Sequence, residues 1–286
     1  MVDYAHVYYK SDDGLTLYAR DYAADAADAL TVLCMPGLTR NSRDFAALAD
    51  HLGGPYRVLC ADQRGRGRSD RDPEWSNYNP GTYVNDMWAL LDHLKIGRVA
   101  LIGTSLGGFM AMIMGSMARE RIAGIVLNDV GPEISIEGIR RIQAYVGRKT
   151  MVRTWDDAVE EVRRNNAGVY PDFGPEDWRA FAGLLYEEDD RGIPVPAYDP
   201  DIAKPLETEE TTPVDLWPVF RTLAGLPLLG IRGALSDILT EDTFKRMKSE
   251  VPNMECVTVP RCGHAPQLEH PVARGAIDAF LERLSA

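Results

Sequence analysis

Short, mostly apolar runs alternate with amphipathic stretches along much of the 286-residue chain, and this alternation is the strongest constraint on its fold. A strand that is apolar at nearly every position must be buried on both faces, which requires a parallel sheet with helices on both sides. The runs predicted as strands are LTVLCM, YRVLCADQ, RVALIG, IAGIVLND, LPLLGIRG and MECVTV. The sequence therefore predicts an α/β fold, preceded by a β-hairpin over residues 6–22.

The alternation is interrupted in the middle of the chain. Between residues 133 and 212 there is no strong strand pattern, and the stretches GIRRIQAYV, TWDDAVEEVRRN and GPEDWRAFAGLLYEE predict short amphipathic helices. A structureless loop of this length is improbable inside a compact domain. We therefore expect a core domain formed by residues 1–132 and 213–286, interrupted by a helical insert, residues 133–212.

Charge and cysteine spacing exclude several classes of function. The chain has 31 basic and 43 acidic residues, a net charge of −12, which on average repels nucleic acid and anionic membranes. No apolar stretch approaches the ~18 residues of a membrane span, and the first residues lack the pattern of a signal peptide. The four cysteines show no C-x-x-C spacing, which favours a reducing compartment and no metal site. We expect a cytoplasmic protein without nucleic-acid or membrane partners, and the oligomeric state stays open.

A serine inside a cluster of glycines follows one of the predicted strands. The stretch VALIGTSLGGFMA contains the pattern G-x-S-x-G, with Gly103, Ser105 and Gly107 at its fixed positions. This pattern is typical of a sharp turn from a strand into a helix that exposes a nucleophilic serine. Because such a turn crowds the residues two before and two after the serine, only small side chains fit there. We therefore predict that Ser105 is a nucleophile with a positive φ angle.

A nucleophilic serine needs a base, and the base needs an orienting carboxylate. We predict His264 as the base because it follows the last predicted strand, and loops at the carboxyl ends of parallel strands line the site. His270 stands before Pro271 at the start of a predicted helix, where capping accounts for it. Asp237 and Asp129 both end strands ahead of the histidine, so either could orient it. Asp237 puts the acid at the usual point of the chain and is preferred, with Asp129 as the alternative.

Four motifs together resemble those of the α/β-hydrolase superfamily, over residues from about 10 to 284. They are GTSLGG around the serine, DQRGRGRSD after the fourth strand, LSDIL around Asp237 and GHAPQLEHP around His264. The resemblance implies an eight-stranded, mostly parallel sheet with a helical cap inserted after the sixth strand. It also implies an oxyanion hole made by the backbone N–H groups of Leu38 and Leu106, and chemistry without a cofactor or metal.

One position departs from the family pattern. The family commonly has His-Gly before the first oxyanion donor, where this sequence has Pro36 and Gly37. The donor at Leu38 can survive this change, because backbone N–H groups hold the oxyanion and not the missing imidazole. The resemblance also places the RGRGR run, residues 64–68, in a tight structural turn, and the net charge of −12 argues against its binding nucleic acid.

These features predict a serine hydrolase that acts on a small-molecule substrate by acyl transfer. A small, largely apolar carboxylic ester or lactone is the expected substrate, with short-chain esters first. A carbon–carbon bond hydrolase of aromatic ring-cleavage products is the alternative. Such enzymes typically have Asn before the serine and Trp after the histidine, where this chain has Thr104 and Ala265. A non-catalytic ligand receptor on the same fold is a further hypothesis, against which an intact triad argues.

Overall fold

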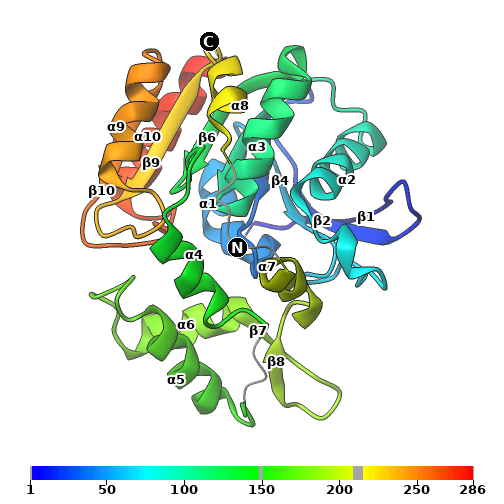
Figure 1. Ribbon diagram of the computed structural model, residues 1–286. Coiled ribbons are helices and arrows are strands. Elements are labelled where there is room, and N and C mark those ends of the chain that lie inside the picture. The colour runs from blue at the N-terminus through cyan, green and yellow to red at the C-terminus, as the bar shows by residue number, and fades with distance from the viewer. Residues whose placement is uncertain (1, 148–150, 209–214, 286) are drawn as a thin grey trace.

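The computed structural model describes residues 2–147, 151–208 and 215–285 (Figure 1). In these residues eight strands form one sheet in the order β1-β2-β4-β3-β5-β6-β9-β10. The strands are β1 (Ala5–Lys10), β2 (Thr16–Tyr22), β3 (Thr31–Met35), β4 (Arg57–Asp62), β5 (Val99–Thr104), β6 (Ile122–Asn128), β9 (Leu228–Gly233) and β10 (Glu255–Val259). Strand β2 pairs antiparallel with both β1 and β4, and the remaining pairs are parallel. The predicted eight-stranded, mostly parallel sheet is confirmed.

Helices cover both faces of this sheet, as the apolar strands require. They are α1 (Ala46–Leu52), α2 (Pro80–His93), α3 (Leu106–Met117), α8 (Trp217–Thr222), α9 (Glu241–Glu250) and α10 (Pro271–Ser285). Side chains of α2, α3, α8 and α9 share one buried cluster, and side chains of α1 and α10 share the other. Strand β3 shows the division, because Leu33 belongs to the first cluster while Val32 and Cys34 belong to the second. Successive side chains of a strand point to opposite faces, so every position of β3 is buried.

The segment between β6 and β9 contains the three helices predicted for the helical insert. These are α4 (Ile136–Gln143), α5 (Trp155–Asn166) and α6 (Pro175–Leu185), followed by the short helix α7 (Lys204–Thr208). In Figure 1, α5 and α6 lie at the bottom of the view, beyond one end of the sheet, and α4 lies between them and the core. The predicted end of the helical insert at residue 212 lies outside the described residues, so the division into a core domain and a cap stays a prediction.

Two short strands inside the helical insert were not expected from the sequence. Strands β7 (Tyr186–Glu188) and β8 (Pro194–Pro196) pair antiparallel. Strand β7 takes the last three residues of GPEDWRAFAGLLYEE, which was predicted to be helical, so that prediction is wrong at its end. Each strand has only three residues, and β8 begins and ends with proline, a residue usually confined to sheet edges. A run this short and rich in proline carries little strand signal.

Four single-turn 3-10 helices complete the described elements. They are η1 (Ser42–Phe45), η2 (Trp75–Asn77), η3 (Arg119–Arg121) and η4 (Pro200–Ala203). Within the described ranges, the structure has no helix that is both long and apolar enough to cross a membrane.

Candidate active site

Ser105 occupies the sharp turn between β5 and α3 that the sequence predicts. Its backbone has φ 52° and ψ −115°, a conformation that non-glycine residues seldom adopt without a functional reason. The predicted positive φ angle is therefore confirmed. The Ser105 N–H donates to the carbonyl oxygen of Asn128 at 3.0 Å, which holds the turn against the end of β6.

The glycines on either side of the turn are required by close backbone contacts. A Cβ atom added to Gly103 would overlap the Gly107 carbonyl group, and one added to Gly107 would overlap the carbonyl of Met35 at the end of β3. The crowding expected two residues before and after the serine is thus present in the structure. Because glycines occupy these positions, helix α3 begins directly after Ser105, and the first N–H groups of a helix that begins there point toward the site.

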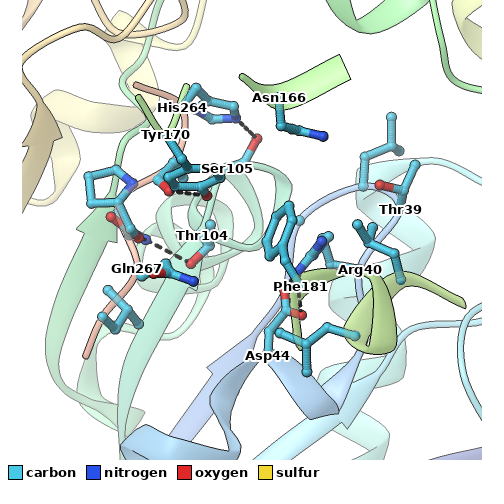
Figure 2. Close-up of a pocket in the computed structure, with 18 of the residues that line it drawn as sticks. Thr39, Arg40, Asp44, Thr104, Ser105, Asn166, Tyr170, Phe181, His264 and Gln267 are labelled. Atoms are coloured by element: carbon cyan, nitrogen blue, oxygen red, sulfur yellow. Dashed lines mark hydrogen bonds and ion pairs between the residues drawn. The ribbon is translucent and has the colours of Figure 1, made fainter. Parts of the chain in front are cut away.

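His264 connects the serine to an acidic residue. Its Nε2 atom lies 2.9 Å from Ser105 Oγ (Figure 2). Its Nδ1 atom lies 2.8 Å from Asp129 Oδ2. Because a carboxylate oxygen only accepts hydrogen bonds, Nδ1 carries the proton and the neutral ring presents the Nε2 lone pair to the serine hydroxyl. His270 takes no part in this arrangement. Its ring accepts a hydrogen bond from the N–H of Val272 at 3.2 Å, at the start of α10, which agrees with a capping role.

The prediction of Asp237 as the acid is wrong, because its carboxylate does not contact His264. The alternative acid, Asp129, occupies the position beside the imidazole. Asp129 follows β6 with φ 55° and is fully buried. Its carboxylate also accepts hydrogen bonds from the N–H of Gly233 at 2.7 Å and from the hydroxyl of Ser236 at 2.6 Å. The end of β9 and the loop after it, in which Asp237 was expected to provide the acid, instead supply the donors Gly233 and Ser236 that hold the carboxylate of Asp129 against His264.

Asp237 faces the helical insert. Both of its carboxylate oxygens accept hydrogen bonds from Arg141 of α4, one of them from Nη2 at 2.9 Å. Burial raises the pKa of Asp237, but hydrogen bonds from Arg141 and the positive charges around it lower the pKa overall. The carboxylate of Asp237 is therefore engaged in an ion pair with the helical insert and does not bond to the imidazole.

The two predicted oxyanion donors flank the serine. Leu106 is the first residue of α3, and Leu38 follows Gly37, whose added Cβ would lie 3.7 Å from Ser105 Cβ. Within the described residues, neither N–H donates to a recorded protein acceptor. The carbonyl of Leu38 accepts a hydrogen bond from Nε of Arg66 at 2.8 Å, which fixes the orientation of this loop. Leu38 lines the pocket together with Ser105, so its N–H stays a predicted oxyanion donor despite the change to Pro36 and Gly37.

A pocket of about 150 Å³ opens at Ser105, a size at which a cavity can hold a benzene ring. Its walls come from the oxyanion loop, α4, α5, α6 and the loop after β10. Phe181 of α6 supplies an aromatic wall, and Tyr145, Asn166 and Tyr170 bring polar atoms from the helical insert. Figure 2 shows Ser105, His264 and Tyr170 on one side of the pocket, and Arg40 with Phe181 on the other.

Several pocket residues were missed by sequence reasoning. Arg40, Asp44 and Glu269 line the pocket, yet none was predicted as a site residue, although Glu269 lies within the motif GHAPQLEHP around His264. For Arg40 and Asp44, the one sequence feature that points to the pocket is their position directly after the expected oxyanion loop, in GLTRNSRDF. Among the described residues, no group of three or more His, Cys, Asp or Glu side chains could hold a metal ion.

Comparison with known proteins identifies the family of the chain. A family model described as the alpha/beta hydrolase fold matches residues 31–271. The chain belongs to the α/β-hydrolase family. A crystal structure of an α/β-hydrolase from Novosphingobium aromaticivorans superposes with a TM-score of 0.93 at 44% sequence identity, covering 99% of both chains.

Two curated relatives of this α/β-hydrolase that match most of its length are named as hydrolases. The chain is 33% identical over 274 residues to 3-hydroxybutyrate-oligomer hydrolase from Cupriavidus necator, covering 91% of each chain. It is 27% identical over 233 residues to 2-(acetamidomethylene)succinate hydrolase from Mesorhizobium japonicum, covering 82% of this chain and 81% of that one. These similarities support a hydrolase.

Proposed function

We propose that this α/β-hydrolase is a serine hydrolase that cleaves small, largely apolar carboxylic esters or lactones, with short oligoesters of 3-hydroxybutyrate as the first substrates to test. The observation that carries the proposal is the hydrogen-bonded series Ser105–His264–Asp129 at the wall of a small pocket. The similarity to a 3-hydroxybutyrate-oligomer hydrolase supports the choice of an oligoester.

Acylation begins with the hydroxyl of Ser105. As Oγ attacks the ester carbonyl carbon, His264 Nε2 accepts its proton, and the carbonyl oxygen becomes an oxyanion. The Asp129 carboxylate holds the imidazole in the correct tautomer and stabilises the imidazolium. The N–H groups of Leu38 and Leu106 donate to the oxyanion, and each such donor typically contributes ~10²–10³ in rate.

Collapse of the tetrahedral intermediate breaks the bond to the alcohol. The imidazolium of His264 gives its proton to the departing oxygen, leaving an acyl group on Ser105 and a neutral imidazole. Water then attacks the acyl group while His264 again accepts a proton, and a second collapse releases the acid and restores the serine hydroxyl. Every proton in this cycle moves between Ser105, His264, water and the substrate, so the step needs no further reactant.

The test is turnover by the purified chain of 4-nitrophenyl butyrate, linear 3-hydroxybutyrate dimer and trimer, and a 2-hydroxy-6-oxo-dienoate. We expect ester hydrolysis by the wild type and loss of at least ~10³-fold in kcat for Ser105→Ala. A preference of ~100-fold in kcat/KM for the dienoate, about 2.7 kcal/mol, would favour the carbon–carbon bond hydrolase instead. Turnover of esters that is equal in the wild type and in Ser105→Ala would contradict the proposal.

A further inference from the structure

A largely buried guanidinium, that of Arg40, lies in the wall of the pocket opposite the nucleophile. A Cβ atom added to Gly37 would lie 3.5 Å from Arg40 Cγ and 3.7 Å from Ser105 Cβ, so the two side chains flank the same glycine. The Arg40 guanidinium lies 4.5 Å from the centre of the Phe181 ring, and its side chain is 16% exposed. Among the described residues that line the pocket, Arg40 is the one arginine or lysine.

The guanidinium of Arg40 already forms an ion pair with a carboxylate of the protein, that of Asp44. Its Nε and Nη2 atoms donate to the two oxygens of Asp44 at 2.6 and 2.7 Å, in a two-point ion pair. Asp44 lies in η1, whose start is held by Asn41, because the Asn41 side chain accepts a hydrogen bond from the N–H of Arg43. The local fold therefore sets the acidic partner against Arg40 before any substrate enters.

A second carboxyl group, that of Glu269, lines the same pocket. Burial raises the pKa of Glu269, and the Asp44 carboxylate adds to this effect, while the Arg40 guanidinium acts in the opposite direction. The part of the pocket around Arg40 thus contains two carboxyl groups and one guanidinium. A substrate carboxylate placed there would lose its water, compete with Asp44 for the guanidinium and lie close to like charge.

We propose that Asp44 is a specificity-determining residue of this pocket: by holding Arg40 in a closed ion pair, it selects uncharged acyl chains over acyl chains that end in a carboxylate. This inference rests on the proposed ester hydrolysis. It predicts that removing the charge of Asp44 while keeping its shape converts Arg40 into a receptor for a substrate carboxylate. Arginine suits this task, because its planar N–H groups match the geometry of a carboxylate.

The experiment compares two acyl chains of five carbons, 4-nitrophenyl pentanoate and mono-4-nitrophenyl glutarate. Rates measured with Ser105→Ala are subtracted, because a neighbouring carboxylate speeds the uncatalysed reaction of the glutarate ester. For Asp44→Asn we expect the ratio of kcat/KM for glutarate to that for pentanoate to rise at least tenfold, about 1.4 kcal/mol. The double variant Arg40→Met with Asp44→Asn should return the ratio to within threefold of the wild type.

The matched control is Asp21→Asn. Asp21 forms a similar two-point pair with Arg57, with contacts of 3.0 and 2.7 Å, but it does not line the pocket. This variant should leave the ratio unchanged. An unchanged ratio in Asp44→Asn, or a gain that persists in the double variant, would overturn the inference.

Two further measurements keep the inference testable. If Asp44→Asn does not fold, as judged by thermal melting, Asp44→Ser takes its place with the same expected result. If the wild type turns over neither ester, the proposed function fails, and the charge preference is then tested by the binding of glutarate and pentanoate to wild type and Asp44→Asn by calorimetry. There, a gain in glutarate affinity of tenfold or more supports the inference, and a smaller gain contradicts it.

Discussion

The sequence alone did not decide which of two aspartates orients His264. Asp129 and Asp237 both follow strands near His264 in space, and chain order favoured Asp237. The structure instead places a carboxylate oxygen of Asp129 at 2.8 Å from Nδ1 and engages Asp237 with Arg141. The deciding features are the positive φ of Asp129 and its hydrogen bond from Ser236, both of which arise from tertiary structure.

Replacing each aspartate by asparagine in turn distinguishes the role of Asp129 from that of Asp237. We expect Asp129→Asn to lower kcat by ~10⁴, because an amide cannot hold the correct tautomer or stabilise the imidazolium. Asp237→Asn should keep kcat within about threefold of the wild type, and loss of a half-exposed ion pair should lower stability by about 0–1 kcal/mol. The measurements are steady-state kinetics on one ester and chemical denaturation. The reverse order of kcat effects would assign the acid to Asp237.

Other residues of the site were predictable because their chemistry is local. Ser105 and its glycines form a continuous motif, and steric crowding within a few residues explains it. His264 was distinguished from His270 by its position after the last strand rather than at a helix start. Arg40 was not predictable as a pocket residue, because its place there depends on packing against Phe181 of α6. Glu269 lies in the motif around His264, but nothing local in that motif predicts that its side chain lines the pocket.

At the scale of elements, the loop that contains RGRGR supports the oxyanion loop. Arg64 is buried and bonded to three carboxylates, those of Asp13, Asp72 and Asp86. Arg66 is also buried, and it donates to the Leu38 carbonyl at 2.8 Å. The structural role predicted for this turn agrees with these contacts.

We expect Arg66→Met to lower kcat by ~10–100-fold with little change in KM, because its hydrogen bond positions a donor that acts mainly in the transition state. Arg66→Lys, which keeps a donor and the charge, should recover part of the loss. Thermal melting of each variant separates this effect from unfolding. An Arg66→Met variant that folds and has the kcat of the wild type would show that the contact does not position Leu38.

The same loop joins the core to the helical insert. The N–H of Gly67 donates to the Ala197 carbonyl at 2.9 Å, and the N–H of Asp199 donates to the Gly65 carbonyl at 2.7 Å. These contacts link residues more than a hundred positions apart. No local pattern predicts such pairing, which is why the helices of the helical insert were predicted while its attachment and the β7–β8 pair were not.

At the scale of the whole molecule, a rigid sheet carries the reacting groups and the helical insert closes the pocket above them. Ser105, Asp129 and His264 follow β5, β6 and β10, so three strands of one sheet set their relative positions. The sheet was predictable because its central strands, β3, β4, β5, β6 and β9, are apolar and buried on both faces. The pocket was not, because its walls combine the core with α4, α5 and α6.

The most direct test of the central claim, that Ser105 is the nucleophile of this hydrolase, is peptide mass spectrometry after reaction with a fluorophosphonate. We predict a single covalent adduct on the peptide that contains Ser105, no adduct in Ser105→Ala, and loss of ester turnover in proportion to labelling. An adduct on a different residue, or full turnover by protein labelled at Ser105, would contradict the account.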